Sequence, residues 1–281
     1  MRLLILGAGN VGLEVAARVR AAGGSVVATT TREERLPELL AAADEAVVLV
    51  GSDAAAVARA AEGCDAILMS ASPPLMKSTT VEERRESYRD VLVTSCESAA
   101  AACDRVVFTS SISVFGDGRQ EPGDLITEQT PRTTSDEPSS VYFAMAEDAA
   151  LGAPRGAVLR LADVYGHPRD IDFTSRVRLA HQYMGGSVAF ARDGLLHRVH
   201  VEDVARGILH VLDDGLVGTY HLVPDLQRPP TNGEAFDSLA DAAGLPRLEF
   251  RGELATPTKQ VSSAKIRGTG FAFAHPADPL H

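Results

Sequence analysis

The stretch that decides the fold is Arg2-Leu3-Leu4-Ile5-Leu6-Gly7-Ala8-Gly9-Asn10-Val11-Gly12. An apolar run leads directly into the pattern G-x-G-x-x-G, and an amphipathic run from Val11 to Ala22 follows it. This order of strand, tight glycine turn and helix is typical of the first βαβ unit of a dinucleotide-binding domain. The sequence therefore predicts a dinucleotide site at the very start of the chain.

Each residue of this turn has an expected role. Gly7 makes the sharp turn out of the strand, and Gly9 lacks a Cβ, so that the backbone can approach a pyrophosphate closely. Gly12 lets the helix pack against the strand. The free amides at the start of the helix, around Asn10 and Val11, then face the phosphates.

Composition narrows the class of protein. The chain has 281 residues, of which 45% are hydrophobic and 23% charged, which is typical of a globular protein with one large α/β domain. The net charge of −11 disfavours nucleic acid and an anionic membrane surface as partners. The cysteines, Cys64, Cys96 and Cys103, are scattered without C-x-x-C spacing. We therefore expect a cytoplasmic protein without disulfides, structural metal, a signal peptide or a membrane span.

Strand and helix patterns alternate through the first 160 residues. Near-continuous apolar strands between helices indicate a parallel sheet covered on both faces. We predict an α/β fold, a Rossmann-type doubly wound parallel sheet, with a dinucleotide-binding domain over residues 1–165. A smaller substrate-binding lobe is expected over 166–281, interleaved with the main sheet. The predicted helices include Arg32–Ala43, Val81–Ala102, Tyr142–Ala150, Phe173–Tyr183 and Asn232–Ala243, before a tail that ends in coil.

The end of the second predicted strand indicates which dinucleotide is bound. NAD-preferring folds place an acidic residue there, whereas this chain has Thr30 and then Arg32. Because a guanidinium binds phosphate in bidentate fashion, these residues favour NADP over NAD. Asp53, after the third strand, is expected either to approach the adenine or to cap the helix behind it.

Five further motifs, in order along the chain, resemble those of the extended short-chain dehydrogenase/reductases, the NAD-dependent epimerase/dehydratase group. The motifs are Thr109–Gly116 (TSSISVFG), Thr127–Pro131 (TEQTP), Tyr142, Leu159–Gly166 (LRLADVYG) and His200–Ala205 (HVEDVA). The spacing of the glycine turn and the short chain resemble the compact, atypical branch of that family. The resemblance implies a carbonyl–alcohol redox step that uses a nicotinamide cofactor.

The resemblance also implies site residues. Tyr142 is expected to exchange a proton with the substrate oxygen, and Ser111 to hydrogen-bond the same oxygen, with Ser113 as a second candidate. The family's Y-x-x-x-K pattern requires a lysine four residues after the tyrosine, and this chain has Ala146 there. A free tyrosine is almost entirely neutral at pH 7, so without the lysine it is a better acid than base. Reduction of a small carbonyl is therefore the expected direction.

Other interpretations stay open at this point. His167, Arg176 and His197 are candidates to replace the missing lysine. The same fold could support a non-redox lyase, isomerase or cyclase with the cofactor unspent, or a non-catalytic NADP-binding protein.

Two further expectations concern partners. The small-residue face of the helix predicted at Val81–Ala102 allows close helix–helix contact, and the resemblance implies a homodimer through this helix. The acidic loop Gly116–Ser139 is expected on the substrate side, where it disfavours a nucleotide-sugar diphosphate unless Arg169, Arg176 or Arg178 face the pocket.

Overall fold

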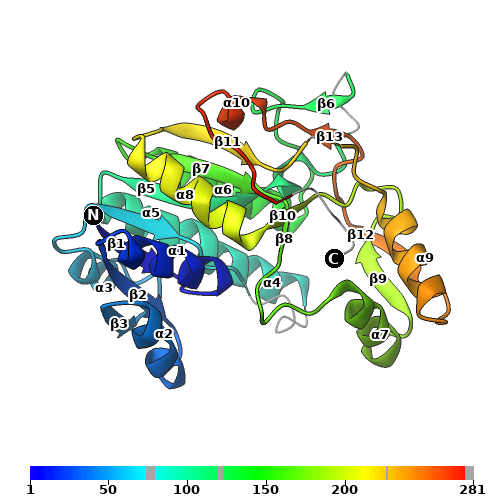
Figure 1. The fold of residues 1–281 in the computed structure, drawn as a ribbon, viewed down its shortest axis with the longest axis horizontal. Coiled ribbons are helices and arrows are strands. Elements are labelled where there is room, and N and C mark those ends of the chain that lie inside the picture. The colour runs from blue at the N-terminus through cyan, green and yellow to red at the C-terminus, as the bar shows by residue number, and fades with distance from the viewer. Residues whose placement is uncertain (74–79, 119–122, 226, 276–281) are drawn as a thin grey trace.

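A seven-stranded parallel sheet forms the centre of the computed structural model, which describes residues 1–73, 80–118, 123–225 and 227–275 (Figure 1). Lys77 lies outside the described residues. The strand order is β11-β7-β5-β4-β1-β2-β3, and every neighbouring pair is parallel. The strands are β1 (Arg2–Leu6), β2 (Ser25–Thr30), β3 (Glu45–Val48), β4 (Ala66–Met69), β5 (Val106–Ser111), β7 (Ala157–Leu161) and β11 (Gly218–Leu222).

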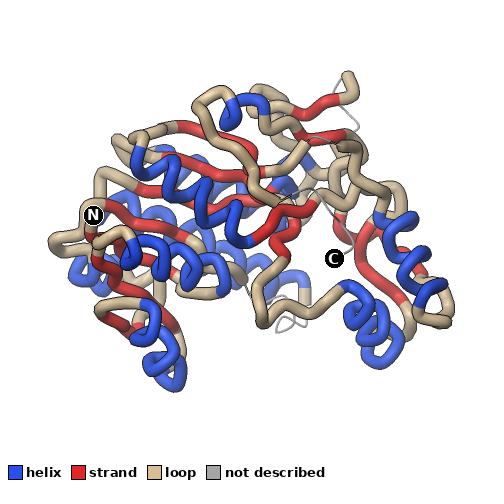
Figure 2. Tube along the Cα trace, viewed as in Figure 1, coloured by secondary structure: helices blue, strands red, loops and turns tan. Residues whose placement is uncertain are grey.

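Helices cover both faces of this sheet, as Figure 2 shows by colour. One face carries α1 (Asn10–Ala21), α2 (Leu36–Ala42) and α8 (Val201–Asp213). The other face carries α3 (Ala54–Ala60), α4 (Val81–Tyr88), α5 (Ser95–Ala102) and α6 (Pro138–Leu151). The predicted doubly wound α/β fold is therefore confirmed. None of the helices within the described ranges has the length and apolar character that crossing a bilayer requires.

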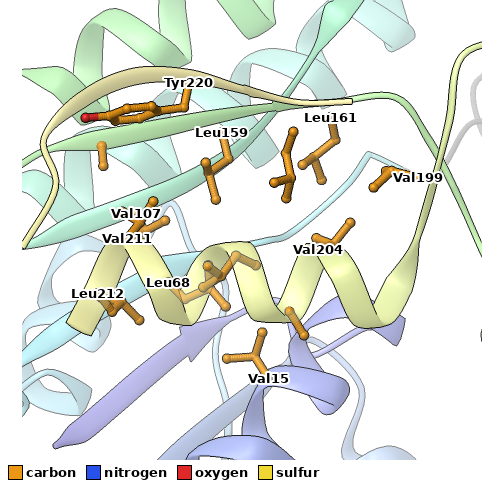
Figure 3. Close-up of a cluster of buried hydrophobic side chains, with 14 of the residues drawn as sticks. Val15, Leu68, Val107, Leu159, Leu161, Val199, Val204, Val211, Leu212 and Tyr220 are labelled. Carbon is orange, nitrogen blue, oxygen red and sulfur yellow. The ribbon is translucent and has the colours of Figure 1, made fainter. Parts of the chain in front are cut away.

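The core on the α1–α8 face is built from aliphatic residues of strands and helices alike. Figure 3 shows Val204 and Val211 of α8 beneath Leu159 of β7 and Val107 of β5, with Val15 of α1 alongside. All five are at most 1% exposed. Because α8 comes from the second half of the sequence, this packing joins the two predicted halves into one core.

A separate lobe has its own small core. It comprises α7 (Phe173–Tyr183), β9 (Ser187–Phe190), α9 (Asn232–Ala242) and β12 (Glu249–Leu254), on the right of Figure 1. Phe173 packs against Phe236 with ring centroids 5.2 Å apart. The domain boundary predicted at 165/166 therefore places β11 and α8 apart from the sheet, although β11 is one of its strands and α8 packs on it. The small lobe of the structure consists of α7, β9, α9 and β12.

Short elements connect these parts. Two pairs of parallel strands lie outside the main sheet and the lobe: β8 (Asp163–Tyr165) with β10 (Arg198–His200), and β6 (Leu125–Ile126) with β13 (Gln260–Val261). The helix α10 (Ala264–Arg267) follows β13. The tail therefore contains strands and a helix before its coil.

Two predicted helices are interrupted. The Arg32–Ala43 segment begins as a 3₁₀ turn, Glu33–Arg35, and the α-helix starts only where Pro37 can occupy the first turn. The Val81–Ala102 segment contains a π-helical section, Arg89–Thr94, between α4 and α5. There the Ser95 hydroxyl donates to the Asp90 carbonyl at 3.0 Å, which compensates for the altered backbone pairing.

Candidate dinucleotide site

The candidate site lies at the carboxyl edge of the sheet, between β1 and β4. From β1 the chain proceeds to β2 and β3 on one side, then crosses to β4 on the other. Such a reversal of strand order opens a crevice in which doubly wound folds bind ligands. The glycine turn follows β1 at this point, and β4 ends beside it, where the Ser70 hydroxyl donates to the Gly7 carbonyl at 3.0 Å.

The three glycines of the turn occupy different environments. Gly7 has φ of 84°, and a Cβ there would lie 2.4 Å from the Cα of Ala71. At Gly12 a Cβ would lie 3.0 Å from Cγ2 of Ile5, so glycine keeps α1 close to β1. At Gly9 a Cβ would meet no atom within 4 Å. The space beside Gly9 is therefore open to a ligand, which fits a pyrophosphate there.

The start of α1 supplies donors to the same space. Gly9 is the N-cap residue and has no side chain to cap the helix. The first-turn amides of Asn10, Val11 and Gly12 have no intrahelical acceptor, and they carry the positive end of the helix dipole. Uncapped amides beside an open Gly9 form a binding place for an anionic phosphate.

Two threonines at the end of β2 hydrogen-bond the glycine turn and the segment that follows β2. Thr29 and Thr30 are buried. The Thr29 hydroxyl accepts a hydrogen bond from the Gly7 amide at 3.1 Å, and the Thr30 hydroxyl accepts one from the Arg32 amide at 3.2 Å. The Arg32 side chain is 58% exposed and lies 3.8 Å from the Glu34 carboxylate. The phosphate-binding role predicted for Arg32 stays a prediction.

The arginine that contacts the glycine turn is Arg35, which the sequence reading missed. Its Nη2 donates to the Ala8 carbonyl at 2.9 Å, its Nε donates to Glu38 at 3.0 Å, and its side chain is 16% exposed. The Arg35 guanidinium also lowers the pKa of the Glu38 carboxyl. Arg32 precedes the 3₁₀ turn with an extended backbone, at φ of −127° and ψ of 119°, and its side chain points into solvent, whereas Arg35 ends that turn and contacts the glycine turn.

A second contact reaches the turn from the loop after β8. The Asn10 amide nitrogen donates to Asp170 at 2.9 Å, and Arg169 donates to the Asn10 side-chain oxygen at 2.8 Å. Arg169 also forms an ion pair with Glu38. Of the three arginines considered for the substrate pocket, Arg169 thus contacts Asn10, at the start of α1, beside the glycine turn. Nothing in the sequence indicated this contact, because its partners are 160 residues apart.

Asp53 has a local partner. It is the N-cap of α3, and its Oδ1 accepts a hydrogen bond from the Ala56 amide at 3.0 Å. Of the two roles left open by the sequence, the structure shows the helix cap. Contact with adenine stays a prediction.

The serines after β5 lie at the same edge of the sheet. Ser111 caps the 3₁₀ turn Ile112–Phe115, and its Oγ accepts a hydrogen bond from the Ser113 amide at 3.1 Å. As a hydroxyl that accepts one bond, it still has a proton to donate to a ligand. The Ser113 hydroxyl is buried and has no partner within the described residues, while the Ser113 carbonyl accepts from Ser140 at 2.7 Å.

A buried ion pair fixes the rotation of α6 against the sheet. Glu147 is 1% exposed and accepts two hydrogen bonds from Arg160, at 2.8 and 2.7 Å. The Ser110 hydroxyl donates to the same carboxylate at 2.6 Å. Ser140 and Glu147 are seven residues apart, nearly two full turns, so both face the carboxyl end of β5.

Tyr142 lies on another side of α6. Two residues along a helix correspond to a rotation of about 200°, so Tyr142 points away from the face that carries Ser140. Its ring is 6% exposed, belongs to the apolar cluster with Tyr88 and Ala146, and lies 6.0 Å from the Arg89 guanidinium. Within the described chain no hydrogen bond joins Tyr142 to the serine loop. Its role as proton donor stays a prediction.

The candidates to replace the missing lysine are engaged elsewhere. Position 146 is a fully buried alanine, Ala146. The Nε2 of His197 accepts a hydrogen bond from the Val261 amide at 3.2 Å, and burial lowers the pKa of His197 to about 4. Arg176 donates to a carboxylate, and His167 accepts from a backbone amide. His197 is therefore neutral at pH 7 and cannot supply the positive charge of a lysine.

Among the described residues, one group brings metal-binding side chains together. His200, Glu202 and His275 have ligand atoms within 4.8 Å of one another. The two imidazoles stack with centroids 3.7 Å apart and 15° between their planes. Since a ring nitrogen coordinates in its ring plane, stacked rings direct their lone pairs side by side and not toward one ion. This arrangement does not fit a metal centre.

The parallel sheet, the switch point and the open glycine turn define the class: this is a Rossmann-type dinucleotide-binding protein. The model of the NAD dependent epimerase/dehydratase family matches residues 3–222. The chain therefore belongs to that family, as the sequence motifs predict. A comparison with curated proteins finds no match.

Solved structures share the fold over nearly the whole chain. A short-chain dehydrogenase/reductase superfamily protein from Agrobacterium tumefaciens, with bound NAD, is 22% identical with a TM-score of 0.75, covering 100% of this chain and 94% of that chain. The dTDP-glucose 4,6-dehydratase DesIV from Streptomyces venezuelae, with NAD bound, is 23% identical with a TM-score of 0.72, covering 98% and 92%. A UDP-glucuronic acid 4-epimerase from Bacillus cereus, with NAD, is 13% identical with a TM-score of 0.76, covering 100% and 96%.

Proposed function

We propose that this chain binds NADP(H) and uses it to reduce a small carbonyl compound, with Ser111 hydrogen-bonded to the substrate oxygen. The observation that carries the proposal is the placement of an open glycine turn and a donor hydroxyl on one edge of the sheet. β1 and β5 flank β4, so their carboxyl ends are about 10 Å apart at the usual strand spacing. A dinucleotide at Gly9 can therefore extend toward Ser111.

The preference for NADP rests on Arg35. The neighbours with known structures contain NAD, so the family fold alone does not favour NADP. Arg35 adds a positive charge, which suits a phosphate ester, directly beside the glycine turn. Glu38 does not cancel this preference, because Arg169 shares the same carboxylate.

When bound at the glycine turn, NADPH would supply the hydride for the carbonyl carbon. The Ser111 hydroxyl donates a hydrogen bond to the carbonyl oxygen, stabilises the negative charge that develops there, and relays a proton from solvent. The amide of Ser113 holds the Ser111 oxygen in place. Without a lysine to stabilise an anionic base, the chain suits reduction and not alcohol oxidation.

One observation favours a second candidate, an NADP(H)-binding protein without catalysis. Tyr142 is buried in an apolar cluster, and the position of the family's lysine is the buried Ala146, so the described residues provide no hydrogen-bonded acid–base pair. A cofactor-binding protein would retain Arg35 and the glycine turn and need no proton donor.

The test is NADPH consumption with a panel of aldehydes, ketones and 2-oxo acids, for the native chain and Ser111→Ala. We expect turnover of at least one carbonyl, reduced by about 100-fold in Ser111→Ala, as for other lost oxyanion donors. Ser238→Ala, at an exposed position on α9, is the matched control and should leave turnover unchanged. Binding of NADPH without turnover of any carbonyl would support the second candidate, and absence of binding would overturn both.

A further inference from the structure

A small cavity opens at the same carboxyl edge of the sheet, on the side of β11 and β10. Its volume is about 130 Å³. Leu196 and the three prolines at 224, 229 and 230 form apolar walls, and two arginines, Arg198 and Arg228, contribute charge. The proposed function assigns no role to this cavity.

The cavity lies close to the serine loop along the sheet. Ser111 is in register with Leu161 of β7, and Asp163, two residues further on, is in register with Arg198 of β10. The pair of β8 and β10 therefore begins two residues beyond Leu161, the residue that lies beside Ser111 in the sheet. A molecule with its carbonyl at Ser111 could extend its other end toward Arg198.

Arg198 is held in a defined orientation. Its side chain is only 5% exposed, and its guanidinium carbon lies 4.2 Å from the centroid of Tyr165 and 4.6 Å from that of Phe173. Its Nε is 3.4 Å from the Asp163 carboxylate. Two aromatic faces confine the guanidinium to a slot, so it presents an edge, which matches a planar carboxylate.

The surroundings carry an excess of positive charge in an otherwise acidic protein. Asp163 is shared between Arg198 and Arg176, which lies 3.2 Å from it, and Arg228 adds a third guanidinium at the cavity. The neighbouring carboxylate of Asp225 is already bound by Ser263 and Arg267. Burial lowers the pKa of Arg198, so an anion in the cavity would stabilise its charged form.

The geometry points to a binding site for the carboxylate of the substrate: we propose that Arg198 and Arg228 hold the acid group of a small carbonyl acid whose carbonyl lies at Ser111, such as a 4-oxo acid, in which two carbons separate the carboxylate from the carbonyl. This inference rests on the proposed function for the carbonyl position, but not for the anion. A cavity of about 130 Å³ accommodates a carboxylate and the carbons next to it.

The test separates binding from turnover. Calorimetry measures binding of 4-oxopentanoate, and of its neutral analogue 4-oxopentanamide, to the native chain saturated with NADP⁺. The variants are Arg228→Gln, which is exposed and will not disturb folding, and Arg198→Met, with Arg59→Gln on α3 as the control. We expect the acid to bind at least tenfold more tightly than the amide, and Arg228→Gln to abolish most of that difference.

The outcomes distinguish the two proposals. Arginine-dependent binding of the acid without NADPH oxidation would support the anion site and overturn the reductase. Equal binding of acid and amide, or a preference unchanged in Arg228→Gln and Arg198→Met, would overturn the anion site whatever the turnover. Displacement of 4-oxopentanoate by inorganic phosphate at concentrations below the Kd of the acid would overturn the choice of a carboxylate.

Discussion

Replacing Gly9 by alanine should separate cofactor binding from stability. A Cβ at Gly9 meets no protein atom within 4 Å, and the backbone there, with φ of −83°, is close to the extended region that alanine adopts. Loss of a glycine N-cap costs at most about 1 kcal/mol, or a melting-temperature decrease of about 2–4 °C. The added methyl nevertheless occupies the space in which the pyrophosphate is expected.

The magnitude follows from the donors at that point. Displacing the pyrophosphate weakens one or two charge-assisted bonds from the amides of Asn10 and Val11, at about 1.5–3 kcal/mol each. The expected loss of NADPH affinity in Gly9→Ala is therefore about 10-fold to more than 100-fold.

The assay pairs calorimetric titration of NADPH with thermal unfolding. Gly7→Ala provides the contrast, because its φ of 84° and the 2.4 Å approach to Ala71 predict loss of stability itself. Ala17→Ser, at an exposed position of α1, should change neither property. Undiminished NADPH affinity in Gly9→Ala would refute the placement of the phosphates.

Three further predictions concern the rest of the molecule. Tyr142→Phe should change turnover by less than about threefold, because the Tyr142 ring is buried in an apolar cluster; a loss of 100-fold or more, as expected for a general acid, would show that Tyr142 is the proton donor. Glu147→Gln should destabilise the fold by about 3–5 kcal/mol, measured by urea unfolding, because Arg160 is left buried without its counter-charge; a change below about 1 kcal/mol would show that α6 is held otherwise. Burial lowers the pKa of His197 to about 4 and that of His221 to about 3, from 6.5. Above pH 6.5 both histidines are neutral in the folded and in the unfolded chain. Between pH 6.5 and these lowered values only the unfolded chain gains protons, so the free energy of unfolding should decrease as the pH decreases, by up to about 1.4 kcal/mol per pH unit for each histidine. Stability that does not change between pH 7 and 5 would contradict this.

The sequence predicted the parts of the fold that local pattern determines. The helix Phe173–Tyr183 has the predicted bounds, because its amphipathic pattern and its cap lie within a few residues of one another. The strands β12 and β13 were not predicted, because they carry no such pattern. Most of Glu249–Leu254 is exposed, and Gln260–Val261 is a strand because it pairs with β6. The partner of each lies far away in sequence.

The site was predictable in outline and not in detail. The glycine turn and Ser111 follow directly from motifs. The arginine at the glycine turn is Arg35 and not Arg32, because Arg32 lies in extended backbone before a 3₁₀ turn, and residue spacing does not show where that turn begins. The orientation of Tyr142 depends on the rotation of α6, and that rotation is fixed by the buried Glu147–Arg160 pair.

The central claim is that Arg35 and the open turn at Gly9 form an NADP(H) site, and direct binding tests it best. Calorimetric titration of the native chain and Arg35→Met with NADPH and NADH should show at least a tenfold preference of the native chain for NADPH. Arg35→Met should lose that preference without loss of NADH affinity, while Arg32→Met should keep it. Tighter binding of NADH than NADPH by the native chain, or binding of neither, would contradict the account.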